Sequence, residues 1–228
     1  MAVLLSPILP GEMNLAVLGE LIGVTATVVL DIGANDGLHT RKFLGLFPSA
    51  QIHAFEPDAR AARQFKMNVT DSRAPLYETA IGAHEGIAEF HVSSGLWPNA
   101  PTATKTRYAD GWDQSGSLRA PKTHKQVWPW CKFESTIQVP VTRLDSWAAA
   151  QNIGQVDLIW ADMQGAERDL IAGGGKTLSR TRYLYTEYSN DEWYEGQANL
   201  LEIMEMLPLF RVTHRFATDV LLQNIEFK

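Results

Sequence analysis

The sequence has little cysteine, no excess of positive charge and no long apolar run. Cys131 is the only cysteine among 228 residues, which excludes an intramolecular disulfide and a zinc site built from several cysteines. Lysine and arginine number 20 against 26 acidic residues, a net charge of -6, so we expect no nucleic acid bound through its phosphates. Met1–Pro10 is apolar, but no basic residue precedes it and Pro7 and Pro10 interrupt it. We therefore expect no signal peptide, no membrane span and a cytoplasmic protein.

The chain does contain enough apolar sequence for one folded domain. Hydrophobic residues make up 45% and charged residues 20%, as is usual in soluble globular proteins. A chain of this length can bury a sizeable core as a single α/β domain, and we find no internal repeat or linker. We predict one domain over residues 1–228, with an insertion at about 94–134.

A strand, a glycine turn and a helix follow one another near the start of the chain. The apolar run Val28–Ile32 ends at Gly33, Gly37 comes four residues later, and a helical pattern covers His39–Phe47. This order is typical of a nucleotide-type site at the carboxyl edge of a parallel sheet. The spacing is neither the dinucleotide fingerprint G-x-G-x-x-G nor a P-loop, because no Gly-Lys-Ser/Thr follows.

The charge of this turn indicates the kind of ligand. It carries Asp31, Asn35 and Asp36 and no cation. A pyrophosphate would be repelled by the two carboxylates, whereas an ammonium or a sulfonium group would be attracted. The turn is therefore typical of an S-adenosylmethionine site, and a glycine turn without a ligand is the alternative.

A second acid supports the same site. The next strand pattern, Gln51–Phe55, ends at Glu56, Pro57 and Asp58. Glu56 follows Asp31 at close to the ~20-residue offset of a ribose-binding acid in such folds. A carboxylate there can accept hydrogen bonds from both ribose hydroxyls. The alternative is an acid that only caps the next helix.

The remaining sequence alternates helical and strand patterns. Helices are predicted at Glu12–Ile22, 58–69 and 198–207. A short helix is predicted to begin at Leu144, and another to run through Leu170 and Ile171 and to end at Gly173–Gly175. Strands are predicted at Ala74–Gly82, Gly86–Val92 (an edge strand), Thr136–Val141 (an edge strand because of Pro140), Gln155–Ala161, Arg182–Glu187, and a terminal hairpin of Phe210–Arg215 and Val220–Ile225. This order predicts a doubly wound, mostly parallel α/β sheet with helices on both faces and a C-terminal antiparallel hairpin.

The segment Ser94–Phe133 has no sustained period and is rich in tryptophan. It holds four of the seven tryptophans, at positions 97, 112, 128 and 130. Disordered segments are poor in aromatic residues, and long ordered loops are usually functional. We expect a lid or an acceptor-binding insertion whose flat indole faces suit sugar rings, the alternative being tryptophans that only pack the insertion onto the core.

Five segments in order identify a family resemblance. They are Asp-Ile-Gly-Ala-Asn-Asp-Gly (31–37), Phe-Glu-Pro-Asp (55–58), Ala-Ile-Gly (80–82), Val-Thr-Arg-Leu-Asp-Ser (141–146) and Asp-Met-Gln-Gly-Ala-Glu (162–167). Together they resemble the FkbM family of methyltransferases. The resemblance implies a Rossmann-like class I fold with a seven-stranded sheet, S-adenosylmethionine as cofactor, and O-methylation of sugars or secondary metabolites. The insertion is not part of it.

The resemblance and the strand ends together suggest residue roles. Asp31, Gly33, Ala34, Asn35, Asp36 and Gly37 would hold the methionine part of the cofactor; Glu56 the ribose; and Pro57, Asp58, Ala80 and Ile81 the adenosine. Asp162 ends a strand beside the expected position of the methyl group. The acceptor would be a small molecule or a glycan.

Two acids are candidates for the general base. Asp162 and Glu187 end neighbouring predicted strands, and burial would have to raise the pKa of either to make it a good base. His39 and His124 are weaker candidates. A metal-dependent variant with Asn190 as a third oxygen ligand is possible, but we expect no metal.

Other functions remain open at this stage. An N-methyltransferase acting on a small amine would need no strong base. A nicotinamide-dependent oxidoreductase is disfavoured by the acidic turn. A non-catalytic S-adenosylmethionine-binding or scaffold protein would use the insertion to bind a partner.

Overall fold

The computed structural model describes residues 7–227. The apolar stretch Met1–Ser6, on which part of the expectation about a signal peptide rests, lies outside the described residues. Within 7–227, none of the helices combines the length and the apolar composition that crossing a membrane would need.

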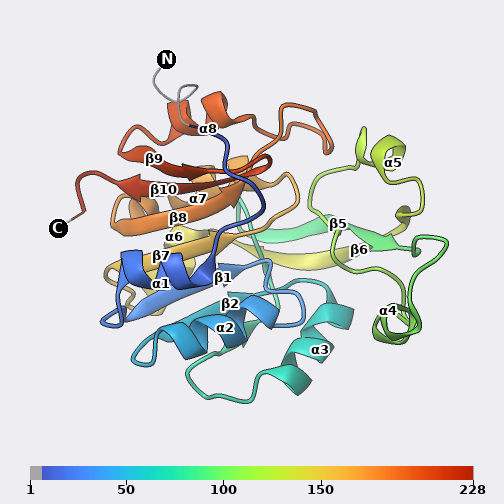
Figure 1. The fold of residues 1–228 in the computed structure, drawn as a ribbon, viewed down its shortest axis with the longest axis horizontal. Coiled ribbons are helices and arrows are strands. Elements are labelled where there is room, and N and C mark those ends of the chain that lie inside the picture. The colour runs from blue at the N-terminus through green and yellow to red at the C-terminus, as the bar shows by residue number, and fades with distance from the viewer. Residues whose placement is uncertain (1–6, 228) are drawn as a thin grey trace.

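A seven-stranded sheet forms the centre of the molecule (Figure 1). Its order is β3-β2-β1-β7-β8-β10-β9. The strands are β1 (Val28–Ile32), β2 (Gln51–Phe55), β3 (Leu76–Tyr77), β7 (Val156–Ala161), β8 (Thr181–Glu187), β9 (Phe210–Arg215) and β10 (Asp219–Asn224). Strands β3, β2, β1, β7 and β8 pair in parallel, while β10 runs antiparallel to both β8 and β9. The predicted mostly parallel sheet with a C-terminal antiparallel hairpin is confirmed.

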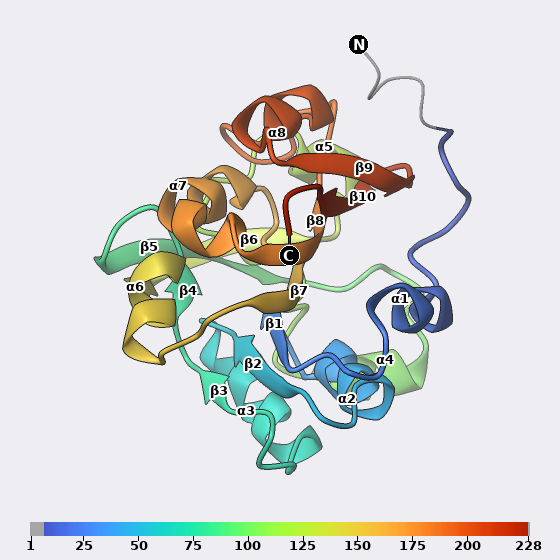
Figure 2. The same cartoon turned by 90° about the vertical axis from the view of Figure 1, so that its left-hand side faces the viewer.

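Helices cover both faces of this sheet (Figure 2). One face packs against α1 (Leu15–Ile22), α2 (Leu38–Leu46) and α3 (Ala59–Asn68), and the other against α6 (Leu144–Ala150), α7 (Glu167–Leu178) and α8 (Leu200–Met206). Neighbouring residues of a strand point to opposite faces, so Val29 joins the first core and Leu30 the second, both fully buried. Because both faces of the sheet are buried, most of the strand residues are apolar, without alternating polar positions.

The insertion lies to one side of the main sheet, beyond a second, smaller sheet (Figure 1). That sheet has the order β4-β6-β5, from β4 (Ala80–Ile81), β5 (Gly86–Ser94) and β6 (Lys132–Thr142). Between β5 and β6 the chain forms two short helices, α4 (Thr102–Arg107) and α5 (His124–Val127). The antiparallel pair therefore holds both ends of the tryptophan-rich segment.

Three details of the expected elements are wrong, two in the strands and one in a helix. The strand predicted at Ala74–Gly82 is two strands, because the chain turns at Thr79, whose hydroxyl donates to the Pro140 carbonyl (3.0 Å), and then joins the other sheet. Strand β6, which is predicted to lie at an edge because of Pro140, instead lies between β4 and β5. On the β4 side only Val141 and Thr142 are paired, so the pairing begins just beyond Pro140. The predicted edge position of β5 is confirmed.

The glycine run at 173–175 does not end a helix, because α7 continues to Leu178. A Cβ at Gly173 would lie 2.0 Å from the Gly82 carbonyl oxygen, and one at Gly174 would lie 3.1 Å from Leu144. These glycines therefore allow α7 to pack closely on its neighbours. Three consecutive glycines are typical of a helix end, but here they lie inside α7, where they allow close packing on Gly82 and Leu144.

Candidate active site

The glycine turn after β1 brings three strand ends together. Gly33 has φ +81°, and a Cβ there would lie 1.9 Å from the carbonyl oxygen of Asp162. Its N–H and that of Ala34 both donate to the Phe55 carbonyl at 3.0 Å. Only glycine fits this approach, because a side chain would push the turn off the end of β7. The turn thus joins the ends of β1, β2 and β7.

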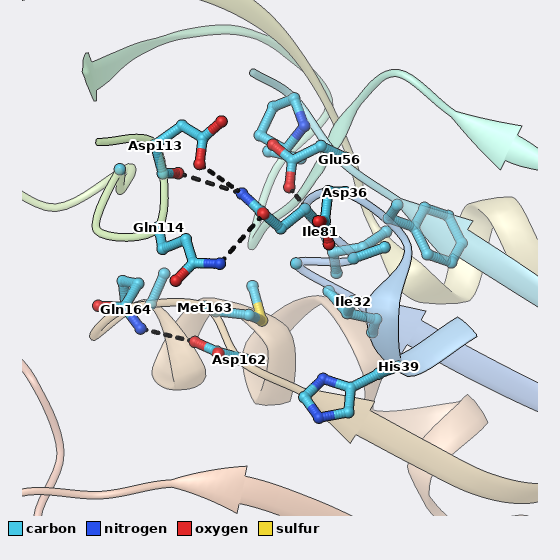
Figure 3. A pocket seen from close by; sticks show the side chains of 18 of the residues that line it. Ile32, Asp36, His39, Glu56, Ile81, Asp113, Gln114, Asp162, Met163 and Gln164 are labelled. Atoms are coloured by element: carbon cyan, nitrogen blue, oxygen red, sulfur yellow. Dashed lines mark hydrogen bonds between the residues drawn. The ribbon is translucent and has the colours of Figure 1, made fainter. Parts of the chain in front are cut away.

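A cavity of about 360 Å³ opens at these strand ends, within the range of small-molecule sites. Nine of the twelve predicted cofactor-binding residues line it: Gly33, Ala34, Asn35, Asp36, Glu56, Pro57, Ala80, Ile81 and Asp162. The cavity is also lined by Glu12, Lys42, Gln164 and the insertion residues Trp112, Asp113, Gln114, Gly116 and Leu118. None of these is among the predicted cofactor-binding residues, although the insertion residues lie in the segment that we expect to act as a lid or to bind the acceptor. Figure 3 shows the side chains around the cavity.

Three of the predicted residues support the cavity without lining it. Asp31 is buried, and its carboxylate accepts a hydrogen bond of 2.5 Å from the Thr40 hydroxyl. Gly37 has φ +82°, and a Cβ there would lie 2.4 Å from Val69. Asp58 caps α3, as expected, by accepting from the Arg60 N–H at 2.9 Å. These contacts position the two turns that carry the lining residues.

Glu56 organises the upper part of the cavity through both oxygens. One oxygen accepts from the Asn35 N–H at 2.9 Å and the other from the Asp58 N–H at 2.7 Å. Burial raises the pKa of Glu56 to about 8 despite these two bonds. Each carboxylate oxygen has a second lone pair, so Glu56 can still accept hydrogen bonds from a ligand.

The two candidate bases are adjacent and half-buried, but only Asp162 lines the cavity. Gln164 joins them, because its Nε2 donates to Asp162 (2.6 Å) and to Glu187 (3.1 Å). Burial raises the pKa of both carboxyls, and the Asp162 charge raises that of Glu187 further. A hydrogen bond between the two carboxyls lowers the pKa of Asp162 and raises that of Glu187. Within the pair, these interactions favour the proton on Glu187 and the negative charge on Asp162.

The third residue of the possible metal site lies elsewhere. Asn190 is exposed and lines a separate polar cavity together with Arg119, Arg168 and Glu192. Over residues 7–227, no three histidine, cysteine or acidic side chains are grouped so that they could hold a metal ion.

Among the histidines considered as bases, only His39 reaches the cavity. Burial and the nearby Lys42 lower its pKa to about 4, so it is neutral at pH 7. Its ring packs on Trp160, with centroids 4.8 Å apart. His124, by contrast, packs between Trp128, Phe133 and Tyr194 outside the cavity.

The insertion contacts the glycine turn directly, which the sequence did not predict. Arg107 forms an ion pair with Asp36 at 2.5 Å. The Asn35 amide donates to both the carbonyl and the carboxylate of Asp113 at 3.3 Å, and Gln114 donates back to Asn35 at 3.5 Å. The sequence shows an acid and an amide at positions 113 and 114, but no local pattern identifies Asn35 as the residue that they contact. Segment 112–118 thus forms one wall of the cavity.

Acidic groups dominate the cavity wall. Its carboxyls are Glu12, Asp36, Glu56, Asp113 and Asp162, against the single cation Lys42. Burial raises the pKa of Asp113 as well. A ligand that carries positive charge would stabilise the ionised forms of Glu56, Asp113 and Asp162, whose pKa values are raised by burial. The cavity is therefore suited to a cationic or neutral polar ligand and unsuited to a phosphate.

Comparisons with known proteins agree with this arrangement. The model of the methyltransferase FkbM domain matches residues 31–216. The 2-O-methyltransferase NoeI of Sinorhizobium fredii is 45% identical over 202 residues, covering 86% of this chain and 79% of NoeI. Methyltransferase 1 of Beauveria bassiana is 26% identical over 149 residues, covering 64% of this chain and 57% of that protein.

One solved structure has the same fold. The methyltransferase FkbM from Methylobacillus flagellatus superposes with a TM-score of 0.50 at 13% identity, over 86% of this chain and 43% of that one. The resemblance inferred from five short segments is confirmed by the family match and the 45% identity. The chain belongs to the FkbM methyltransferase family.

Proposed function

We propose that this protein transfers the methyl group of S-adenosylmethionine to a hydroxyl of a sugar or a small secondary metabolite. One observation carries the proposal. A single cavity joins the glycine turn after β1, the buried Glu56 after β2 and the half-buried Asp162 after β7, and its wall holds five carboxyls and one lysine. Such a wall favours a sulfonium over a phosphate.

Each part of the cofactor has a matching part of the cavity. Glu56 would accept from the ribose hydroxyls, while Ala80 and Ile81, both buried, would contact the adenine. Glu12 would face the ammonium end of the methionine part, together with Asp36, whose carboxylate also pairs with Arg107. Asp31 has a supporting role here, because its carboxylate is already held by Thr40.

The methyl transfer itself needs alignment and removal of a proton. An acceptor oxygen must lie in line with the methyl carbon and the sulfur, at ~3–3.5 Å from the carbon. The oxygen forms the new C–O bond as the C–S bond breaks, and the C–S electron pair stays on sulfur as a neutral thioether. The hydroxyl proton passes to Asp162, the one of the two candidate bases that lines the cavity. General base help of this kind contributes roughly 10²–10⁴-fold in rate.

The choice of a hydroxyl as acceptor rests on one relative, and the choice of a sugar rests on the cavity wall. NoeI is named as a 2-O-methyltransferase and shares 45% identity. The insertion adds Trp112 to the wall next to the polar groups of Asp113 and Gln114. An indole beside hydrogen-bonding groups suits a neutral sugar ring.

A screen of acceptors tests the proposal. The protein is incubated with S-adenosylmethionine and matched neutral glycosides, with the 2-hydroxyl free or blocked, and with matched amines; mass spectrometry locates the methyl group. We expect O-methylated glycoside, and Asp162→Asn should lower turnover far more than it weakens cofactor binding. Methylation of amines alone would establish the N-methyltransferase alternative. Binding of S-adenosylmethionine without any turnover would favour a non-catalytic binding protein.

A further inference from the structure

Gln164 adopts an unusual backbone conformation at the edge of the cavity. Its φ is +50°, in the left-handed region that residues other than glycine rarely occupy. The neighbouring structure holds it there: its carbonyl accepts from the Ser117 hydroxyl at 2.8 Å. Gly165 follows with φ +92°, and a Cβ there would lie 2.7 Å from Tyr194. Such conformations persist where the surroundings enforce them, often at functional sites.

This conformation directs the side-chain amide toward two half-buried acids. Nε2 lies 2.6 Å from Asp162 and 3.1 Å from Glu187, so each of its two N–H groups can serve one carboxyl. On the other side, Oε1 lies 3.1 Å from the Tyr194 hydroxyl, which also lies 2.8 Å from the Ser115 carbonyl. Figure 3 shows the bond from Gln164 to Asp162. The amide is therefore held from both ends.

The two acids need such an arrangement because their charges compete. Two carboxyls in contact do not both ionise readily, so one proton is shared between them. Further ionisable groups that interact with the pair come from the elements around it: Glu12 ahead of α1, Asp31 in β1, Glu167 in α7, Tyr194, and Asp219 in β10. All of them are acids, and each negative charge among them makes ionisation of Asp162 harder. A donor fixed on Asp162 counteracts this.

We propose that Gln164 is a positioning residue for methyl transfer, which holds Asp162 in its ionised form facing the cavity and keeps Glu187 behind it as the protonated partner. The inference rests on the proposed function, since it concerns the base of that same reaction. Gln164 touches neither the sulfonium nor the reacting oxygen in this role. It acts by donating one hydrogen bond to each acid.

The test compares Gln164→Leu with the parent protein, using S-adenosylmethionine and the acceptor found in the screen. Loss of a hydrogen bond to the ionised form raises the pKa of Asp162. We expect the acid side of the profile of kcat against pH to shift by about one unit to higher pH. On that side kcat should fall roughly tenfold, and it should recover at high pH. The dissociation constant of S-adenosylmethionine should change by less than about threefold, because no cofactor contact is removed.

A matched control and a second variant keep the result interpretable. Gln197→Leu removes another buried glutamine, one that accepts from the Tyr194 N–H at 3.4 Å outside the cavity, and should leave the profile in place. If Gln164→Leu does not fold, Gln164→Asn tolerates the left-handed backbone but is too short to reach both acids. A drop in kcat by one constant factor at every pH, with the acid side of the profile unmoved, would overturn the inference.

A second measurement needs no acceptor, so it separates this inference from the proposed function. The carboxyl infrared band of Asp162 is isolated as the difference between the protein and its Asp162→Asn variant, and is titrated with S-adenosylhomocysteine bound. The midpoint pH of this titration should rise when Gln164→Leu is introduced into both the protein and its Asp162→Asn variant. An unchanged midpoint contradicts the role of Gln164. If instead the midpoint rises but no acceptor is ever methylated, the positioning of the acids stands and the proposed function fails.

Discussion

Asn35 and Asp113 join the glycine turn to the insertion across the top of the cavity. The Asn35 amide donates to the backbone carbonyl and to the carboxylate of Asp113, both at 3.3 Å. The same Asn35 gives its backbone N–H to Glu56. Because one residue contacts both the proposed ribose-binding acid and the insertion, the position of the insertion and the shape of the cofactor site depend on each other.

The first prediction concerns this link. Asp113→Ala removes the side-chain half of the contact with Asn35 while the backbone half remains. We expect S-adenosylmethionine to bind about two- to tenfold more weakly, the loss of one hydrogen bond of roughly 0.5–1.5 kcal/mol. Asp110→Ala is the matched control, since Asp110 is exposed and contributes its backbone carbonyl to Arg60 (3.0 Å), which alanine keeps. Equal affinities of both variants in calorimetry would show that the Asp113 side chain does not support the cofactor site.

The second prediction concerns Glu56 and the ribose. Glu56→Gln keeps the shape of the side chain but replaces one acceptor oxygen with a donor, so it fits the two backbone N–H groups and a diol less well. We expect S-adenosylhomocysteine to bind at least about tenfold more weakly, since hydrogen bonds to a charged group contribute roughly 1.5–3 kcal/mol. The loss should be smaller for the 2′-deoxy analogue, which lacks one ribose hydroxyl.

An exposed acid provides the comparison for that experiment. Glu78→Gln alters a residue that forms a surface ion pair with Lys66 and should leave both affinities unchanged. If Glu56→Gln weakened the ribose and deoxyribose ligands equally, Glu56 would act only by holding the turn through Asn35 and Asp58.

The third prediction concerns stability between pH 6.5 and 8. Burial raises the pKa of Asp31 and Glu167 to about 7 and that of Glu56 to about 8. The folded chain then binds more protons than the unfolded chain in this range, so its stability falls as pH rises. Burial lowers the pKa of His39, His53 and His124. These histidines oppose the trend only near pH 6.5, where they are still partly protonated in the unfolded chain, and their effect fades within about one pH unit above that value.

Thermal melts across this pH range measure the effect. Tm should fall from pH 6.5 to pH 8, and saturating S-adenosylmethionine should reduce the slope because its positive charge favours the ionised acids. Calorimetry in two buffers of different ionisation enthalpy should then detect proton release on binding. A Tm that is flat or rises with pH would mean that these carboxyls are ionised in the free protein.

The fourth prediction concerns the glycine run of α7. Gly173→Ala would place a Cβ 2.0 Å from the Gly82 carbonyl, whereas a Cβ at Gly175 meets nothing within 4 Å. Gly173→Ala should therefore destabilise the protein, by about 1–3 kcal/mol as for other overpacked sites. Gly175→Ala should stabilise it by about 0.5–1 kcal/mol through helix propensity. Denaturant unfolding compares the two, and an equal effect of both would refute the close contact between α7 and the turn after β4.

Much of the fold and of the cavity could be predicted from local sequence. The strand Val28–Ile32 and the glycines after it are specific because the turn, the strand end and the acid all lie within one short segment. Glu56 follows the same logic, since it also ends a strand. What could not be predicted depends on contacts between distant segments: Asp113 lies next to Asn35 only in the folded chain. Gly173 is likewise explained only by Gly82.

The central claim is that the acid-lined turn after β1 holds a sulfonium nucleoside. The most direct measurement is calorimetric titration of the unmodified protein with S-adenosylmethionine and, in parallel, with NAD. The account predicts one site per chain for S-adenosylmethionine, competition by S-adenosylhomocysteine, and no binding of NAD. Binding of NAD at that site, or no heat and no competition at saturating S-adenosylmethionine, would contradict it.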